Sequence, residues 1–426
     1  MESSALKHRY GVVAYGRRDH YQVPLALHEA NALARVFTDF YASHWLIALT
    51  DHFGGSTAQR FRLRHHPELS ARYFSGDWPV TQLISRYLRW RGCTLAERYA
   101  VLNEFLSRRA ARFVVRHPDV GMVCYSYYWS ALAKTRVQGL WSGPAIVFQV
   151  HPAPSHVKRV VTADRKVTGL TYSPEPEEIS SMQTDCEYLD SLRFADGVIV
   201  ASSFTASGLI EDGVPPGKVR VVPYGADAWQ ETKRKDYVAS EQRWEHQRPL
   251  KLLWVGQLAY RKGAHYLFEA VRHFPTDQVQ VSLVSQSVMP SELAALMPPN
   301  ITVYNKVTDE ERQRMYGTHH LFVLPSLVEG FGLVYLEALS EGLPILATNN
   351  SGAPDIIESG VEGFIVAPGS PQAIADVIDI CLSDQTLLPR MSAAARITAA
   401  RWTWARFRAG IRASLAYFEQ RESVER

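Results

Sequence analysis

The stretch Leu321-Phe-Val-Leu-Pro-Ser-Leu-Val-Glu-Gly-Phe-Gly-Leu-Val-Tyr-Leu-Glu337 decides the fold of this chain. It begins with a short apolar run, which predicts a buried strand, and passes through a glycine-containing turn into a helical pattern. Gly330 and Gly332 let the backbone of the turn come close to a ligand. The first helical turn offers amides without partners inside the helix, those of Phe331, Gly332, Leu333 and Val334. Because these amides and the helix dipole favour anions, the turn predicts a diphosphate site.

Short apolar runs that alternate with helical patterns continue through the second half of the chain. The runs lie at residues 249–256, 279–285, 301–304, 320–324, 344–348 and 363–366, with helical patterns such as 264–273 between several of them. Strands separated by helices of this length indicate a parallel sheet with crossover connections. Continuous apolar runs, rather than alternating ones, indicate a sheet covered on both faces.

The first half of the chain shows a weaker version of the same pattern. Strands are predicted at 10–15, 120–125, 145–150 and 197–201, and a helical segment at 81–116. Both halves are therefore interpreted as Rossmann-like α/β domains. Two such domains that face each other leave a ligand crevice at the carboxyl ends of their strands.

A length of 426 residues is too great for a single hydrophobic core. We divide the chain into an N-terminal domain, 1–227, a charged and glutamine-rich linker, 228–248, and a C-terminal domain, 249–400. The remainder, 401–426, is predicted to be an amphipathic helix that packs across the molecule. Its apolar face consists of Trp404, Phe407, Ile411, Leu415 and Phe418.

Composition excludes several classes of protein. With 46% hydrophobic and 21% charged residues, the chain is neither disordered nor fibrous. Its cysteines are scattered, which is typical of a reducing compartment, and stand at Cys93, Cys124, Cys186 and Cys381. The first ten residues lack the apolar core of a signal peptide, and no run of about 18 apolar residues predicts a membrane span. We expect a cytoplasmic protein, or one held peripherally at the inner membrane face.

The net charge of +3 is unevenly distributed. Residues 60–116 contain twelve Arg and no Lys against four acidic residues, so this segment carries +8 and the remainder −5. A helix over residues 81–91 would place Arg86 and Arg89 away from an apolar face made of Leu83, Ile84, Tyr87 and Leu88. That face is either domain core, with solvated arginines, or a surface for peripheral contact with an anionic membrane.

Two glutamates flank the glycine-containing turn. Glu329 is placed to accept hydrogen bonds from a sugar ring, and Glu337, within about two turns of the helix start, from a ribose. The alternative interpretation is that both are surface charges beside a helix. Together with the intervening glycines and the following Gly342-Leu-Pro344, they resemble the Glu-x7-Glu signature of the family 4 retaining glycosyltransferases, glycosyl transferases group 1.

The resemblance covers residues 145–400 and implies the GT-B fold, in which two Rossmann-like domains with parallel sheets face a central cleft. It includes Trp254-Val-Gly-Gln-Leu-Ala-Tyr-Arg-Lys-Gly263. Lys262 matches a family lysine that neutralises the donor diphosphate. The family's arginine falls on Gln257, which is neutral, and Arg261 is the candidate substitute from a different backbone position.

In the first domain, the resemblance implies a histidine near the donor sugar. It falls on His151, with His156 as the second candidate. The family's glycine-rich first turn is replaced by Tyr15-Gly-Arg-Arg-Asp-His-Tyr-Gln22, where Gly16 permits close approach and Arg17 or Arg18 adds charge. The predicted catalytic residues are therefore His151, Lys262 and Glu329. The predicted donor-binding residues are Gly16, Gln257, Arg261, Lys262, Phe331, Gly332, Leu333 and Glu337.

The resemblance further implies retaining transfer of a sugar from a nucleotide diphosphate sugar to a glycan, lipid-linked or small-molecule acceptor bound by the N-terminal domain. No metal is expected, because cations and helix amides can stabilise the leaving diphosphate. No cofactor and no nucleic acid are expected either. Two alternatives stay open: a nucleotide-sugar 2-epimerase of the same fold, and a catalytically silent binding protein, which Gln257 favours. The sequence defines neither the sugar, the base nor the acceptor, nor the oligomeric state.

Overall fold

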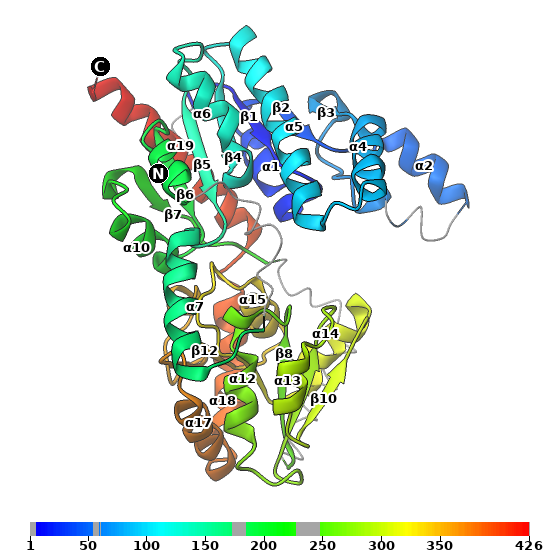
Figure 1. The fold of residues 1–426 in the computed structure, drawn as a ribbon, viewed down its shortest axis with the longest axis vertical. Coiled ribbons are helices and arrows are strands. Elements are labelled where there is room, and N and C mark those ends of the chain that lie inside the picture. The colour runs from blue at the N-terminus through cyan, green and yellow to red at the C-terminus, as the bar shows by residue number, and fades with distance from the viewer. Residues whose placement is uncertain (1–5, 54–58, 60, 173–184, 227–247, 426) are drawn as a thin grey trace.

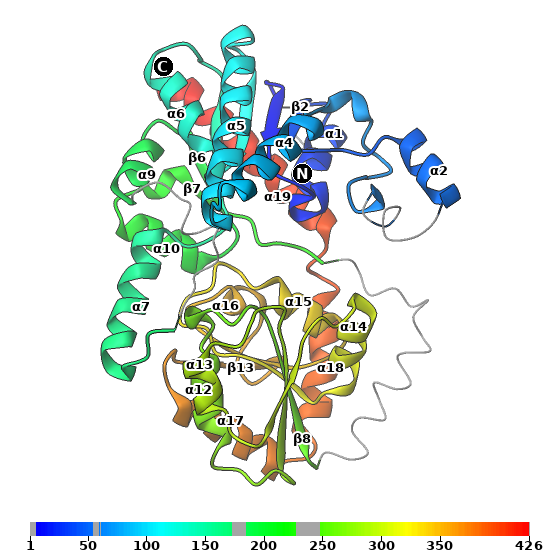
Figure 2. The same cartoon turned by 45° about the vertical axis from the view of Figure 1, so that its right-hand side comes forward.

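Two β-sheets, one in each half of the chain, organise the molecule (Figures 1 and 2). The structure, a computed structural model, describes residues 6–53, 59, 61–172, 185–226 and 248–425. Within these residues, all neighbouring strands of both sheets run parallel. The predicted fold class, two Rossmann-like α/β domains, is confirmed.

The sheet of the N-terminal half has seven strands in the order β3-β2-β1-β4-β5-β6-β7. They are β1 (Tyr10–Val13), β2 (Leu33–Thr38), β3 (Phe74–Gly76), β4 (Gly121–Tyr125), β5 (Ala145–Gln149), β6 (Gly197–Val200) and β7 (Val219–Val221). The helices are α1 (Gln22–Glu29), α2 (His44–Phe53), α4 (Trp78–Trp90), α5 (Leu95–Arg116), α6 (Trp129–Val137), α7 (Pro154–Thr168), α9 (Asp185–Leu192) and α10 (Ser203–Glu211). The four central strands are buried throughout, because helices cover both faces of the sheet.

The sheet of the C-terminal half has six strands in the order β10-β9-β8-β11-β12-β13. They are β8 (Leu250–Val255), β9 (Val279–Val284), β10 (Ile301–Tyr304), β11 (Leu321–Leu324), β12 (Ile345–Thr348) and β13 (Gly363–Val366). The helical elements are the 3-10 turn η6 (Tyr260–Lys262), α12 (Ala264–Val271), α13 (Ser291–Leu296), α14 (Asp309–Thr318), α15 (Leu333–Ser340), α16 (Ala353–Ile356), α17 (Pro371–Ser383) and α18 (Leu387–Ala399). Each predicted apolar run of this half contains one strand.

The predicted helical segment 81–116 is wrong in one respect, since it is two helices, α4 and α5. Gly92 adopts a left-handed φ of 73° just after α4, a conformation that stops a helix. Thr94 then caps α5: its hydroxyl accepts from the Glu97 amide at 3.2 Å, and the Glu97 carboxylate accepts from the Thr94 amide at 2.7 Å. This capping box sets a new helix start and lets α4 and α5 point in different directions.

The last helix, α19 (Trp404–Glu425), returns to the N-terminal half, where the red ribbon of Figures 1 and 2 lies against α1. All five residues of its predicted apolar face are buried. Its Glu419 accepts hydrogen bonds from the Lys7 amide at 2.8 Å and from the Tyr10 hydroxyl at 2.9 Å. The prediction of a C-terminal helix packing across the molecule is confirmed.

Nearly all of the predicted linker 228–248 lies outside the described residues. In the part of the chain that the structure describes, no helix has both the length and the apolar character needed to cross a bilayer.

Candidate active site

The turn between β11 and α15 meets the N-terminal half at Gly330. A Cβ at this position would overlap the carbonyl oxygen of Val150, at the end of β5. The Gly330 carbonyl accepts hydrogen bonds from the hydroxyls of Ser202 and Thr205, the latter at 3.2 Å. The close approach that glycine allows here is therefore to the opposite half of the molecule, whereas the sequence suggested a ligand. The contact joins the segment that follows β11 to the segment that follows β5.

Arg261 and Lys262 of η6 converge on Glu329. The Lys262 ammonium contacts Glu329 Oε2, and Arg261 Nη1 donates to the same oxygen at 3.2 Å. Arg261 Nη1 also donates to the Val328 carbonyl at 3.0 Å, which fixes the guanidinium beside the β11–α15 turn. Arg261 is 4% exposed and Glu329 6%, so the cluster has little screening by water. The structure thus brings together three of the predicted site residues.

Electrostatics holds the Glu329 carboxylate ionised. Burial alone would raise its pKa, but the charges of Lys262 and Arg261 outweigh this effect and lower the pKa to about 2. The cluster therefore carries two cations and one anion at neutral pH. A diphosphate bound against it would meet net positive charge, as a leaving group with developing negative charge requires.

His151 lies two residues after the end of β5, close enough to this cluster for the charges of Arg261, Glu329 and Lys262 to act on its pKa. Burial, followed by the charges of Arg261 and Arg18, lowers the pKa of His151 to about 3. The imidazole is accordingly neutral at physiological pH, so it can offer hydrogen bonds but not a positive charge. The Gln149 side chain holds the backbone in place, donating to the His151 carbonyl at 2.6 Å. His156, the second candidate, lies on α7 with its ring against Phe204, at 5.2 Å between centroids.

The turn after β1 supplies Arg18 rather than Gly16. The Gly16 amide donates to buried Asp39 at 2.9 Å, so a phosphate could bind this amide only by displacing Asp39. Arg18 instead lies over the rings of Tyr125 and Tyr127, at 5.6 and 5.7 Å, and influences His151. Sequence reasoning left the choice between Arg17 and Arg18 open.

Backbone conformation makes this turn unusual. Asp19, His20 and Tyr21 have left-handed φ values of 45°, 54° and 63° in succession, a conformation that costs energy in non-glycine residues. Asp19 holds the turn, since its carboxylate accepts from the hydroxyls of Tyr125 at 2.6 Å and Tyr224 at 3.2 Å. Such strain is typical of functional sites, where the surrounding structure maintains it.

Three further predicted donor residues lie around the start of α15. Gly332 caps the helix with φ 89°, and a Cβ there would overlap the ring of Tyr335. Phe331 is buried with its ring 5.5 Å from that of Tyr224, whereas Leu333 is half-buried. Among the described residues, the amides of Leu333 and Val334 donate to no carbonyl, as predicted for a first helical turn.

Glu337 and Gln257 are more exposed than the buried charged cluster. The Glu337 carboxylate accepts from the Tyr316 hydroxyl at 2.9 Å and lies 3.9 Å from Arg312. One carboxylate oxygen is thus oriented by α14, while the side chain stays 41% exposed and accessible to a ribose. Gln257 is exposed in the loop between β8 and η6. It does not join the cluster, in which Arg261 supplies the second cation.

Sequence reasoning missed a polar network that ties α7 to η6. Asp164 accepts from the hydroxyls of Tyr260 at 2.6 Å and Tyr266 at 2.5 Å, and Thr168 Oγ1 lies 2.5 Å from the Tyr260 hydroxyl. Tyr260 directly precedes Arg261, so the network supports the cationic turn from the N-terminal half. In Figures 1 and 2, α7 extends beside α12, which begins after the same turn. These contacts join residues about a hundred positions apart, a separation that leaves no local signal.

Comparison with known proteins relates part of the chain to a described family and to several curated relatives. Residues 239–398 match the family described as glycosyl transferases group 1. The D-inositol 3-phosphate glycosyltransferase of Corynebacterium jeikeium is 29% identical over 66% of this chain and 68% of its own length. An uncharacterized glycosyltransferase of Methanocaldococcus jannaschii is 26% identical over 51% of this chain. That alignment spans 57% of the relative, so the chain covers little more than half the length of some curated relatives.

Solved structures share the whole fold at low sequence identity. HepE of Anabaena, solved in complex with UDP and glucose, has a TM-score of 0.62 and 16% identity, over 96% of this chain and 99% of its own. Sucrose-phosphate synthase of Thermosynechococcus elongatus has a TM-score of 0.60 and 16% identity, covering 99% and 100% of the two chains. The chain therefore shares the GT-B fold with these structures.

Proposed function

We propose that this protein transfers a sugar from a nucleotide diphosphate sugar to an acceptor, with retention of configuration and without a metal. The observation that carries the proposal is the convergence of Arg261 and Lys262 on Glu329, beside the free amides of α15 and opposite His151. Fixed cations and helix amides are the groups that stabilise a departing diphosphate. The family relationship and the UDP bound by HepE support the same donor class.

Each group has a proposed task in the transfer. The bond from the anomeric carbon to the diphosphate oxygen breaks, and the new bond to the acceptor oxygen forms on the same face. The acceptor proton passes to the departing phosphate oxygen. Arg261, Lys262 and the α15 amides stabilise the negative charge that develops on the departing phosphate. Glu329 accepts hydrogen bonds from the sugar, and its ion pair with Lys262 orients the ammonium group. Neutral His151 contacts the sugar without adding charge.

The donor that we propose to test first is a UDP sugar, because HepE was solved with UDP-glucose. The proposed acceptor class remains a glycan, a lipid-linked sugar or a small molecule. We place the protein in the cytoplasm. The thiols of Cys93, Cys124 and Cys381 are free, which fits a reducing compartment.

Thermal-shift measurements with UDP, GDP and ADP test the donor class. A nucleotide at about 100 times its dissociation constant stabilises the protein by roughly 2.7 kcal/mol. We expect UDP to raise the Tm and the other two to have smaller effects. NMR analysis of the product with an acceptor present then defines the anomeric configuration. Conversion of the donor sugar without any acceptor would support the epimerase instead, and nucleotide binding without turnover of any donor would support a silent binding protein.

A further inference from the structure

Exposed apolar side chains are concentrated in one part of the N-terminal half. The exposed tryptophans of the described residues are Trp45 on α2 and Trp78 and Trp90 on α4, with Trp90 82% exposed. Both helices lie at the end of the N-terminal half that carries the edge strand β3 (Figures 1 and 2). Single exposed apolar residues are ordinary on a soluble protein, but a concentration of large ones marks an interaction surface.

On α4 these residues form a continuous stripe of Val80, Leu83, Tyr87 and Trp90. Their spacing of three, four and three residues places them on one face of the helix. Leu83 and Tyr87 are 65% and 53% exposed, so the interpretation of these two residues as domain core is wrong. Their neighbours Ile84 and Leu88 are half-buried, and Ile84 lies with Phe105 in a groove between α4 and α5. The helix thus packs through one face and leaves a second apolar face exposed.

Arginines flank this stripe. Arg86, Arg89 and Arg91 are exposed, and among the described residues none of the three forms an ion pair with a carboxylate. The Arg91 guanidinium lies 5.9 Å from the Tyr87 ring centroid, which keeps it beside the apolar face. By contrast, Arg109 on α5 is held by Asp77 at 2.5 Å. The stripe therefore lies in a positive electrostatic field, because no carboxylate of the described residues neutralises these three arginines.

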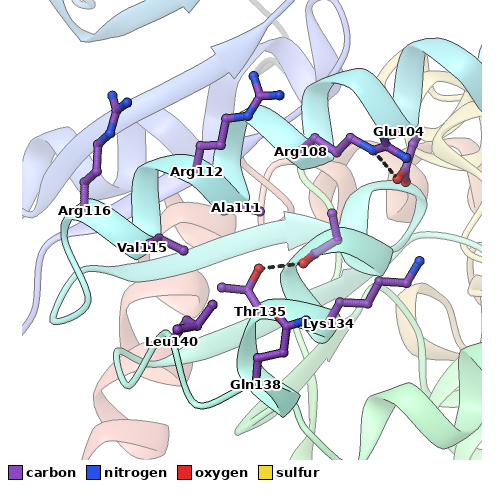
Figure 3. A pocket seen from close by; sticks show the side chains of 11 residues that line it. Glu104, Arg108, Ala111, Arg112, Val115, Arg116, Lys134, Thr135, Gln138 and Leu140 are labelled. Atoms are coloured by element: carbon purple, nitrogen blue, oxygen red, sulfur yellow. Dashed lines mark hydrogen bonds and ion pairs between the residues drawn. The ribbon is translucent and has the colours of Figure 1, made fainter.

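A second row of cations continues the positive field along α5. Arg108, Arg112 and Arg116 recur at four-residue intervals and so share one face of the helix. They line a groove between α5 and α6 together with Lys134, and Arg108 and Arg112 also line the groove beside Ile84 of α4. Figure 3 shows the Arg112 and Arg116 side chains extending away from the α6 side of the groove. Glu104 forms an ion pair with Arg108 at 2.7 Å and neutralises its charge. Arg112 and Arg116, further along the helix, are therefore the residues of this row that extend the positive field.

We propose that the α4 stripe and its arginines form a docking surface for an anionic phospholipid bilayer. Tryptophan and tyrosine favour the headgroup level of a membrane, and guanidinium groups bind lipid phosphates with two hydrogen bonds. A second copy of this chain is a poorer occupant. A two-fold interface would bring the same arginines face to face, and like charges disfavour such contact. This proposal is independent of the sugar transfer proposed above.

Vesicle co-sedimentation tests the surface. The full chain is mixed, at low salt, with vesicles of phosphatidylglycerol and phosphatidylcholine, or with vesicles of phosphatidylcholine alone. We expect binding only to the anionic vesicles, reduced at high salt. Arg86→Gln/Arg89→Gln should partition about 30-fold more weakly, as expected for two cations near an anionic surface. Leu83→Ser/Trp90→Ser should also lose binding, whereas Val288→Ser, which changes a 91% exposed residue of the C-terminal half, should bind like the wild type.

Three results would overturn the proposal: no binding to anionic vesicles at low salt, equal binding to neutral vesicles, or full binding by both double variants. A dimer that forms without lipid and is abolished by Leu83→Ser/Trp90→Ser would assign the stripe to a second copy. The Tm of each variant, measured with and without UDP, reports folding and donor binding separately. Failure of the UDP response in every protein would contradict the proposed function and leave the vesicle result unaffected.

Discussion

The hydroxyl of Tyr260 donates to the carboxylate of Asp164 at 2.6 Å, which joins the turn carrying Arg261 and Lys262 to helix α7. Asp164 also accepts from Tyr266, so both of its oxygens are engaged. Although burial opposes ionisation, the nearby His265 imidazole, at 3.9 Å, and the hydrogen bonds from Tyr260 and Tyr266 lower the pKa of Asp164. Asp164 is thus a positioning residue: it acts on the cationic turn without touching the proposed ligand.

Asp164→Asn should lower kcat/KM about tenfold. The asparagine amide nitrogen is a donor and cannot accept a hydrogen bond, so one of the two tyrosine hydroxyls loses its acceptor. The lost hydrogen bond is worth roughly 1 kcal/mol or more. Glu292→Gln is the matched control. Glu292 accepts from the Thr171 amide at 2.8 Å near the same helix but does not support η6. Steady-state kinetics with a UDP sugar and an acceptor measure both variants. An equal loss in the control would show general destabilisation, and Tm measurements would reveal it.

Lys262→Ala should lower kcat about 100- to 1,000-fold, the typical cost of removing one charge-stabilising group from a transition state. Arg17→Ala is the control cation, since Arg17 points to the side chain of His20 at 3.1 Å. If purified Lys262→Ala retains kcat/KM near that of the wild type, the assignment of the diphosphate to this cluster is wrong.

Glu337→Asp should weaken UDP binding about tenfold, because the shorter side chain withdraws from the ribose and from Tyr316. Glu341→Asp changes a carboxylate four residues later, which accepts from Gln313 at 2.9 Å, and should leave the affinity unchanged. Isothermal titration calorimetry with UDP compares the two. Unchanged affinity with reduced sugar turnover would move Glu337 from the ribose to the sugar.

Activity should persist in EDTA, because the proposed counterions of the diphosphate are Arg261, Lys262 and helix amides. Product formation is measured after dialysis against the chelator. Loss of activity in EDTA, with recovery on addition of magnesium or manganese, would contradict a metal-free reaction.

Acid should destabilise the protein partly through His151. Its pKa falls from 6.5 to about 3 on folding, so its contribution is complete above pH 6.5 and is lost as the pH falls toward 3. At pH 5 the loss is on the order of 1 to 2 kcal/mol. His151→Gln removes the titrating group, and its Tm should fall less than that of the wild type between pH 7 and pH 5. If the Tm of both proteins falls equally between pH 7 and pH 5, groups other than His151 are responsible for the acid sensitivity.

The parts of the fold that could be predicted are those with local signals. The β11–α15 turn combines an apolar run, two glycines and a helical pattern within 17 residues, and each feature supports the others. Strand β2 was missed because Arg35 and Thr38 interrupt its apolar pattern, and β3 because three residues are too few to show one. Both strands exist through pairing with neighbours distant in sequence.

The candidate site, like the fold, was predictable only where its residues carry a local sequence signal. The sequence indicated Lys262 and Glu329 separately, from two strand–turn–helix motifs, but their ion pair requires the parallel order of β8 and β11 in the sheet. The contribution of Arg18 depends on the strained turn at Asp19, His20 and Tyr21, and none of these residue types predicts such a backbone conformation. Asp164 lies on an ordinary polar helical segment, and its role appears only when α7 reaches η6.

The return of α19 to the N-terminal half affects how the protein must be made. Its Glu419 binds Tyr10 of the first strand, a residue 409 positions earlier, so a ribosome synthesises the entire C-terminal sheet before the N-terminal core can close. The later sheet can therefore fold first, while the earlier one waits with α1 uncovered. A separated N-terminal domain would accordingly need α19 attached by a new connection, as in a circular permutation. A division of the gene after residue 227 would yield one fragment without its last helix and another with a helix that has no place to pack.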